Sequence, residues 1–186
     1  MSKRRDDLLK GFDEHYFFME NTVKRNIEAY RMGSVRLRVT DAGGKPVSGA
    51  VVTADQYSHD FNFGCNIFML DEMETEEKNV LYREKFKELF NYAIVPFYWS
   101  DLEPEQGKPR YAADSPKIYR RPAPDLALDY CEENGIRRKG HCLIYHSFTP
   151  AWMPKDVPTQ KRLTEAHLRE VAGRYAGRIQ DWDVEN

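Results

Sequence analysis

The chain has 186 residues, 41% of them hydrophobic and 13% aromatic, which is enough to bury one sizeable core. Its 28 basic and 30 acidic residues nearly cancel and are interspersed, so the sequence shows no basic patch of the kind that binds nucleic acid. No apolar run approaches the roughly 18 residues that a membrane span needs, and residues 1–10 are too charged for a signal-peptide core. We therefore expect no nucleic-acid or membrane partner. A cytoplasmic location is favoured, and a secreted parent whose signal was trimmed stays open.

The cysteines and histidines give no sign of a metal centre. Cys65, Cys131 and Cys142 are odd in number and form no C-x-x-C pair, so we expect reduced thiols without a disulfide framework or structural zinc. His141 and His146 fall in one predicted strand, and their spacing places them on opposite faces of it. Because one cannot reach a metal held by the other, we expect neither a metal nor a cofactor.

Residues 1–58 are predicted to form an N-terminal appendage. Apolar residues recur among charges through the first thirty residues, which predicts a helical lead-in. In VRLRVT at 35–40 apolar and polar residues alternate, and the turn-forming DAGGKPVSG at 41–49 precedes the small apolar run AVVTA at 50–54. This order predicts a β-hairpin after the helix.

From residue 59 onward, stretches typical of strands and of helices alternate, which favours parallel strands joined by helical crossovers. Gly135 and Gly177 follow the last two helical stretches, at the position where a helix C-cap favours glycine. We predict strands over 61–68, 92–99, 137–146 and 179–186, and helices over 75–90, 124–134 and 164–176.

This alternation predicts an α/β fold. Four strands joined by three helices fit either half of an eight-stranded barrel or a small open, doubly wound sheet. A complete (β/α)₈ TIM barrel takes about 250 residues, and residues 59–186 supply about half of that. We therefore predict about the first four β/α units of such a barrel. Its uncovered strand edges should need the remainder of the barrel or a second copy as a partner.

Residues suited to chemistry gather at the carboxyl ends of three predicted strands, where the reactive groups of such barrels lie. Aromatic rings stand there beside carboxylates and amides, a combination suited to sugars, which present apolar C–H faces and hydroxyls. The alternative is that the tryptophans only cover the barrel mouth. The residues are Tyr98, Trp99 and Asp101 at the end of the second strand, Tyr145 and His146 at the end of the third with Trp152 shortly after it, and Trp182, Glu185 and Asn186 at the end of the fourth.

Three segments at these strand ends resemble glycoside hydrolase family 10, the xylanase family. WSDLEPEQGKPRY at 99–111 resembles the Trp-x-x-x-Glu-Pro-x-x-Gly segment after the second strand of that family. KGHCLIYHSFTPAW at 139–152 resembles its Arg-Gly-His-x-Leu-x-Trp-His-Ser-x-x-Pro-x-Trp segment. RYAGRIQDWDVEN at 174–186 resembles the approach to its Trp-Asp-Val-x-Asn-Glu signature. The matches follow the family's order and cover most of residues 61–186.

The resemblance implies a glycoside hydrolase that cleaves a β-linked, xylan-like polysaccharide or oligosaccharide with retention, using one glutamic acid as the acid and a second carboxylate as the nucleophile. In the family the acid immediately follows the residue matched by Asn186, and the nucleophile belongs to a later strand. We therefore expect no catalytic carboxylate within the chain. If Asn186 faces the sugar, alternation turns Glu185 away from it. The implied substrate-binding residues are His146, Asn186, Trp99, Trp152, Tyr98 and His141, and Glu103 has a structural role.

The sequence departs from the family where xylanases carry Glu-Asn-x-x-Lys before the matched Trp99. Residues 94–98 read Ile-Val-Pro-Phe-Tyr instead, and Phe148 replaces the usual Gln. The loss of a clamp for hydroxyls weakens the case for xylan itself, because an unmet hydrogen-bond partner discriminates strongly. Two further hypotheses stay open: a non-catalytic carbohydrate-binding or self-associating half-barrel module, and a family-like fold that lost its activity and acts through the appendage.

Overall fold

A computed structural model describes residues 3–186 in two units, one up to Tyr57 and the other from Ser58 to Asn186. The second unit carries the α/β repeats, and its strands form one sheet in which every adjacent pair is parallel. The strands follow the chain order that a barrel requires, whereas a doubly wound sheet places its first strand inside the order. The predicted partial (β/α)₈ barrel is confirmed. The strands are β1 (Gly64–Asn66), β2 (Tyr92–Pro96), β3 (Arg137–Ile144) and β4 (Asp181–Glu185).

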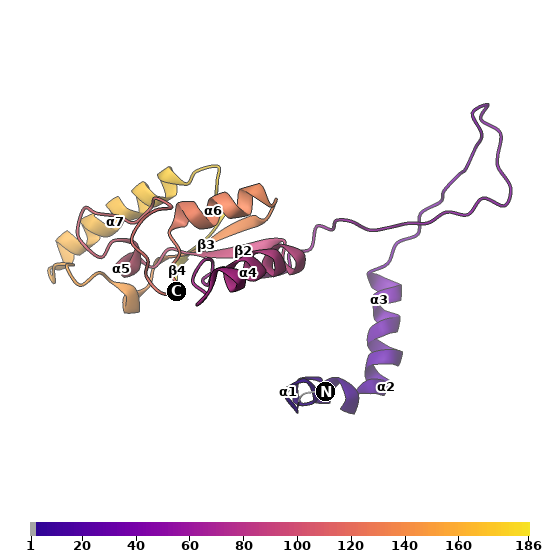
Figure 1. Cartoon of the computed structure of the whole chain (residues 1–186), viewed down its shortest axis with the longest axis horizontal. Coiled ribbons are helices and arrows are strands. Elements are labelled where there is room, and N and C mark those ends of the chain that lie inside the picture. Colours follow the sequence, from indigo (N-terminus) through magenta and orange to yellow (C-terminus); the bar gives the residue numbers. More distant parts are fainter. Residues whose placement is uncertain (1–2) are drawn as a thin grey trace. The chain divides into compact units, whose positions relative to one another are not determined.

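Helices connect successive strands, as Figure 1 shows. Helix α7 starts seven residues earlier than predicted, because Asp156 caps it by accepting from the N–H of Thr159 at 3.0 Å and Pro158 occupies its first turn. Gly135 and Gly177 have φ values of 65° and 83°, which confirms their place at helix ends. The helices of this unit are α4 (Glu76–Leu89), α5 (Trp99–Leu102), α6 (Pro124–Glu133) and α7 (Val157–Arg174), with a 3₁₀ turn at His146–Phe148.

The core lies between one face of the sheet and the helices. Ala93, Val95 and Phe97 are fully buried there among residues of α6 and α7. The Trp182 ring packs edge-to-face on Phe97, with centroids 4.8 Å apart, and crosses Gly140, its register partner in β3. A Cβ on Gly140 would lie 2.2 Å from Cζ3 of Trp182, so glycine is required for this crossing. The core-facing side of the sheet is apolar, which leaves the opposite side for polar groups.

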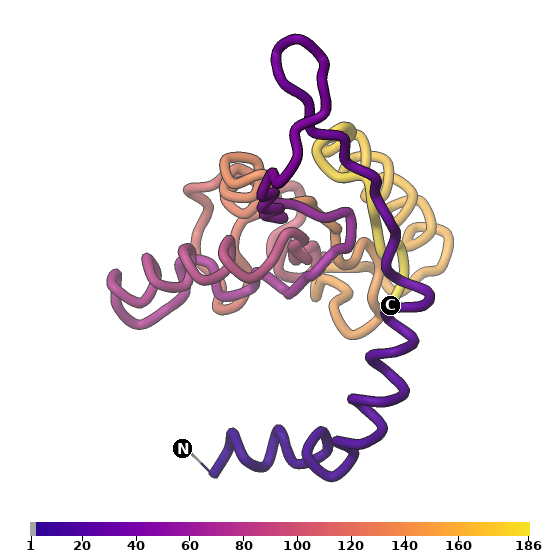
Figure 2. Tube along the Cα trace, turned by 90° about the vertical axis from the view of Figure 1, so that its right-hand side faces the viewer, coloured from indigo at the N-terminus to yellow at the C-terminus, as the bar shows by residue number. Residues whose placement is uncertain are grey.

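The unit up to Tyr57 consists of helices followed by an extended excursion that turns back on itself (Figure 2). Its predicted helical lead-in is confirmed, and no helix within residues 3–186 is long and apolar enough to cross a bilayer. Of the predicted hairpin only the turn forms: one antiparallel bridge joins Thr40 to Pro46, and residues 35–39 and 50–54 form no strands. The helices are α1 (Lys3–Glu14), α2 (Tyr16–Phe18), a π-helical turn (Met19–Val23) and α3 (Lys24–Tyr30).

The strands of the hairpin fail to form because their apolar side chains have no surface to bury against. Val35 and Val51 are 81% and 93% exposed. A two-stranded ribbon is at best marginally stable when no further strand or helix covers its apolar face. Alternating apolar and polar residues therefore show that a segment can form a strand. They do not show that another element packs over its apolar face.

Replacing Gly140 with alanine should destabilise the unit from Ser58 onward by about 1–3 kcal/mol, because the added Cβ meets the Trp182 ring and overpacks the core. Urea unfolding followed by circular dichroism measures this change. Gly173→Ala in α7 is the matched control: a Cβ there meets no atom within 4 Å, so this substitution should stabilise the helix by up to about 1 kcal/mol. A Gly140→Ala variant as stable as the wild type would contradict the packing.

Candidate functional site

The carboxyl ends of β2, β3 and β4 meet at one edge of the sheet. Beyond β2, the N–H of Phe97 donates to the carbonyl of His141 at 2.7 Å, and beyond β4 the N–H of Asn186 donates to the carbonyl of Ile144 at 3.1 Å. These bonds continue the parallel pairing past the strands. Tyr98, the turn after β3 and the end of β4 therefore gather at the edge where barrel enzymes hold their reactive groups.

Two of the predicted substrate-binding residues present exposed side chains at this edge. His146 opens the 3₁₀ turn, and its ring lies edge-to-face to Tyr145 with centroids 5.1 Å apart. Asn186 follows β4 and is exposed as well. An imidazole and an amide can each donate and accept hydrogen bonds, so these two side chains are suited to binding the hydroxyls of a ligand.

Tyr98 lies in a cluster of aromatic rings around one guanidinium. Its ring stacks on Phe148 with centroids 4.2 Å apart, and the guanidinium of Arg121 lies 4.3 Å from the Tyr98 centroid. Nε of Arg121 donates to Asp101 at 2.7 Å, which fixes the cation in place. Burial raises the pKa of the Tyr98 hydroxyl, which keeps that group a neutral donor. A packed cluster thus occupies the positions at which the sequence lacks a polar clamp.

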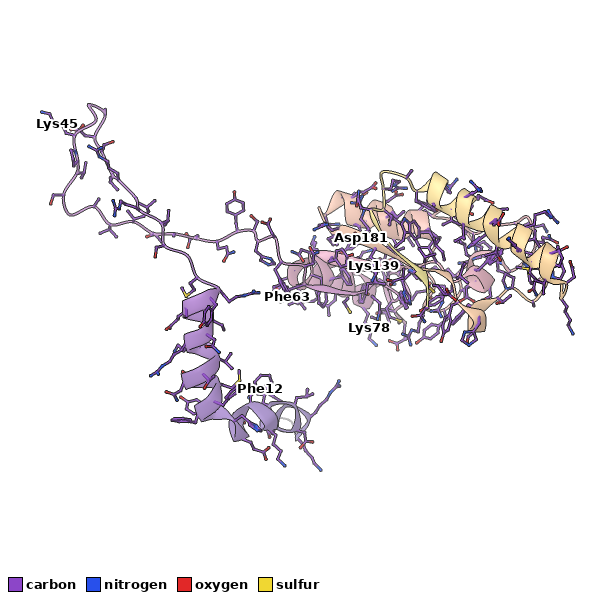
Figure 3. The ribbon with its side chains drawn as sticks, turned by 180° about the vertical axis from the view of Figure 1, so that it is seen from behind. Phe12, Lys45, Phe63, Lys78, Lys139 and Asp181 are labelled. Carbon is purple, nitrogen blue, oxygen red and sulfur yellow. The ribbon has the colours of Figure 1, made fainter. Side chains whose placement is uncertain are left out.

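A polar network covers the sheet face opposite the core. Asp183 accepts hydrogen bonds from Nδ1 of His141 at 2.8 Å and from Nζ of Lys139 at 2.7 Å. Burial alone raises the pKa of the Asp183 carboxyl, but these bonds outweigh it and lower the pKa. Because an ionised carboxylate only accepts, Nδ1 of His141 carries the proton. On the same face Tyr92 donates to Asp181 at 3.0 Å, and Asp181 is the register partner of Lys139 (Figure 3).

The orientation of β4 corrects one expectation. With Asn186 toward the ligand, alternation predicts that Glu185 points away from the site. In the sheet, however, Trp182 packs in the core and Asp183 bonds to His141 on the opposite face. By the two-residue period of a strand, Glu185 lies on the Asp183 face. The face of β4 that turns toward His141 is therefore the Asp183 face.

Trp99 and Trp152 lie beneath the loop that follows β2 rather than at the open edge. Strand β2 ends at Pro96, three residues earlier than predicted, and Trp99 begins α5. Trp99 is 6% exposed, stacks on His167 with centroids 4.0 Å apart, and donates from Nε1 to Glu103 at 2.9 Å. Nε1 of Trp152 donates to the Glu103 carbonyl at 2.8 Å. This geometry gives Glu103 a structural role and favours packing for both tryptophans.

Sequence reasoning missed the polar partners of the Tyr98 cluster. Arg121 belongs to the irregular segment between α5 and α6, where no hydrophobic period signals a contact with Tyr98. Within residues 3–186, no three His, Cys, Asp or Glu side chains are grouped so as to hold a metal ion. The edge instead offers aromatic rings beside hydrogen-bond donors and acceptors, which suits a hydroxyl-rich ligand with apolar faces.

Comparison with known proteins relates most of the chain to one family. Residues 54–186 match the sequence profile of glycosyl hydrolase family 10. The chain is 30% identical over 167 residues to Endo-1,4-beta-xylanase 5 of Arabidopsis thaliana, covering 86% of this chain and 26% of that protein. It is 28% identical over 169 residues to Anti-sigma-I factor RsgI6 of Acetivibrio thermocellus, covering 88% of this chain and 20% of that protein. The chain thus spans about a fifth to a quarter of these relatives.

Solved structures agree on the fold. Xylanase 10B from Thermotoga petrophila, in complex with xylobiose, superposes with a TM-score of 0.50 at 22% identity, over 65% of this chain and 34% of that one. CbXyn10B superposes with a TM-score of 0.53 at 18% identity, over 68% of this chain and 36% of that one. At these identities the likeness establishes a shared barrel fold.

His167 should make the stability of the protein depend on pH. Its buried ring stacks on Trp99, and burial lowers its pKa to about 4, against a hydrogen bond with the Leu143 backbone that raises it. The unfolded chain takes up this proton near pH 6.5, so the folded state loses stability as the pH falls from about 6.5 toward 4. Between pH 6.5 and 5 we expect a loss of about 1.5 kcal/mol from this residue.

A His167→Phe variant keeps a ring against Trp99 and removes the titration, so it should retain its stability over this range. Urea unfolding at pH 7, 6 and 5 measures the difference. His146→Phe is the control, because it makes the same substitution at an exposed position instead of the buried one. Parallel losses in the wild type and His167→Phe would refute the assignment.

Proposed function

Because the chain belongs to glycosyl hydrolase family 10, we propose that the whole protein containing it hydrolyses a β-linked polysaccharide or oligosaccharide, with xylan as the first candidate. The observation that carries this proposal is the gathering of His146, Asn186 and the Tyr98 cluster at the carboxyl edge of the sheet. Sugar-binding chemistry at that edge is what the barrel architecture leads us to expect. The name of the Arabidopsis relative, a xylanase, supports a substrate of this class.

The mechanism we infer is retaining and uses two carboxylates about 5 Å apart. A glutamic acid immediately after Asn186 protonates the departing glycosidic oxygen. A carboxylate from a later strand attacks the anomeric carbon, and water then hydrolyses the covalent glycosyl intermediate with the first residue acting as base.

Residues of this chain then bind and orient the sugar. His146 donates a hydrogen bond to a sugar hydroxyl, and the exposed amide of Asn186 does so from beyond the end of β4, where the alternation of strand faces no longer fixes its direction. The bonds among Lys139, His141 and Asp183 hold the ends of β3 and β4 at a fixed separation beneath the sugar. The Tyr98 cluster sets specificity: where a polar clamp would bind hydroxyls, it offers rings and one phenol, so we expect a weaker preference for xylan over other β-linked glycans than a clamp would give.

Hydrolysis by the full-length protein tests the proposal. On a panel of β-linked plant and bacterial glycans, reducing sugar should be released from at least one, and replacing the glutamate after Asn186 with glutamine should lower kcat by about 10²–10⁴-fold. Glu185→Gln is the matched control, two residues earlier at the end of β4, and it should retain kcat within about tenfold. Inactivity on every glycan would overturn the proposal, and inactivation by Glu185→Gln alone would overturn the assignment of the acid.

The unpaired sheet edges favour a second hypothesis. Within residues 3–186, β1 and β4 each have a strand partner on one side only, so the rest of a barrel or a second copy would have to cover them. If a second copy does so, the chain is a self-associating, non-catalytic carbohydrate-binding module. The polypeptide of residues 1–186 would then be dimeric or larger in light scattering and would bind xylo-oligosaccharides weakly without hydrolysing them. A monomer without affinity for sugars would eliminate this hypothesis.

A further inference from the structure

A stack of side chains joins α7 to the two segments that follow β2 and β3, and the mechanism above does not use it. The ring of His167 lies nearly parallel to that of Trp99, at 10°, with centroids 4.0 Å apart. Nε1 of Trp99 donates to the Glu103 carboxylate at 2.9 Å, and Nε1 of Trp152 donates to the Glu103 carbonyl at 2.8 Å. We call these four residues the Trp99 stack. Through it, the placement of both segments depends on the ring of His167.

His167 is buried but incompletely hydrogen-bonded. The residue is 5% exposed, and among the side chains of residues 3–186 its Nε2 is the only buried nitrogen or oxygen without a hydrogen-bond partner. The hydrogen bond between the ring and the Leu143 backbone raises the pKa of His167, so the ring is the donor in that bond. A neutral imidazole carries one proton, which is therefore on Nδ1. Nε2 is left as an unprotonated nitrogen.

Protonation would add a donor at Nε2 and a positive charge, and the closed stack offers a partner for neither. A buried donor without an acceptor loses its bonds to water and gains nothing in return. The face of Trp99 attracts a cation and offsets part of this cost. Burial nevertheless dominates, because it lowers the pKa of His167 to about 4. The closed arrangement therefore excludes the proton.

The charged groups on the elements packed against His167 do not compensate a positive ring. Within the part of the chain that the structure describes, only burial and the Leu143 bond shift its pKa. The thiol of Cys142, next to Leu143, stays neutral because burial raises its pKa. The remaining groups on α5, β3 and α7 are engaged elsewhere: Asp101 with Arg121, Glu103 with Gly107, Glu170 with Tyr111, and Lys139 and His141 with Asp183.

Trp99 also supports the turn that carries His146. Helix α5, which Trp99 begins, contacts the 3₁₀ turn, and Trp99 lines one small pocket together with Tyr145 and Phe148. Phe148 in turn stacks on Tyr98, with centroids 4.2 Å apart. A displacement of Trp99 would therefore remove support from the His146 turn and from the aromatic cluster beside it.

We propose that His167 is a pH-sensitive support for the strand-end site: the neutral ring holds the Trp99 stack closed, and protonation releases the segments after β2 and β3 into a locally open state that does not bind the glycan. The release itself follows from the packing of His167. Its link to glycan binding rests on the proposed function. His167 is thus a positioning residue, which acts through Trp99 and makes no contact with the sugar.

Hydrogen exchange of the full-length protein, corrected for the pH dependence of the chemical rate, tests the release. The open state takes up the proton that the closed state excludes, so opening becomes more favourable as the pH falls from about 6.5 toward 4. Residues 99–107 and 146–153 should open about 20-fold more often at pH 5 than at pH 7. Their exchange at pH 5 should stay faster than that of β2. Equal rates in β2 would mean unfolding of the whole unit and would overturn a local release.

Two substitutions remove the titration while keeping different contacts of the ring. His167→Phe keeps a ring against Trp99, and His167→Gln keeps a donor for Leu143. Both variants should lose the 20-fold response, and their agreement guards against one that disturbs the fold. His59→Phe removes an exposed imidazole outside the stack and should keep the response. A response that persists in both His167 variants would overturn the proposal.

Exchange in the presence of xylohexaose tests the link to the site, using the full-length protein with glutamine in place of the glutamate after Asn186 so that the sugar is not consumed. A ligand that binds only the closed state, at 100 times its Kd, should reduce the opening of residues 146–153 by up to about 100-fold at both pH values. Bound sugar without this reduction would overturn the link to the site. Failure of xylohexaose to bind, together with inactivity on every glycan, would overturn the proposed function, whereas the release is decided by the exchange of the sugar-free protein.

Discussion

The crossing of Trp182 over Gly140 is the constraint on which the candidate site depends. It locks β3 against β4 in a register that sets His141 opposite Asp183 and leads both strands to finish at one level. A shift by one residue would exchange the two faces of β4, bringing Trp182 into the polar face and Asp183 into the core. The apolar packing of one side chain therefore decides where the polar chemistry of the opposite face can be.

That register also explains why an aromatic cluster can replace a polar clamp. Tyr98 follows β2 on the same side of the sheet as His141, and the two rings meet edge-to-face with centroids 5.5 Å apart. Phe148 comes from the turn after β3, and Arg121 reaches the cluster from a separate loop. Three segments are thus joined by stacking and cation–π contacts, which hold orientation without long flexible side chains. The consequence is a stiff aromatic wall at this edge of the sheet.

The strands and helices from residue 59 onward could be predicted from the sequence, because each has its own hydrophobic period and its own characteristic terminal residues. Gly135 and Gly177 marked helix ends correctly, since a positive φ there is a local requirement. The predictions failed where a segment forms strands only if another element packs over its apolar side chains. Val35 and Val51 alternate like strand residues but lack a surface to pack on.

The edge of the sheet at which the candidate residues meet was predictable, but their contacts were only partly so. The carboxyl ends of parallel strands must share an edge, so His146 and Asn186 could be placed together. The sequence alone cannot tell whether Trp99 and Trp152 line the barrel mouth or support a loop. Their hydrogen bonds to Glu103 in the structure favour the loop. Arg121 reaches Tyr98 across an irregular segment, a contact that no sequence period encodes.

The residues of β4 lie at different levels along the neighbouring strand β3. Side chains on one strand face recur every second residue, about 6.6 Å apart along the strand. Asp183 is level with His141, and Glu185 is level with Ile144, still within the paired strands. Asn186, whose N–H bonds to the Ile144 carbonyl, is the first residue beyond them. Glu185 therefore lies beyond the His141–Asp183 pair on the same face, whereas His146 lies outside the paired strands, in the 3₁₀ turn.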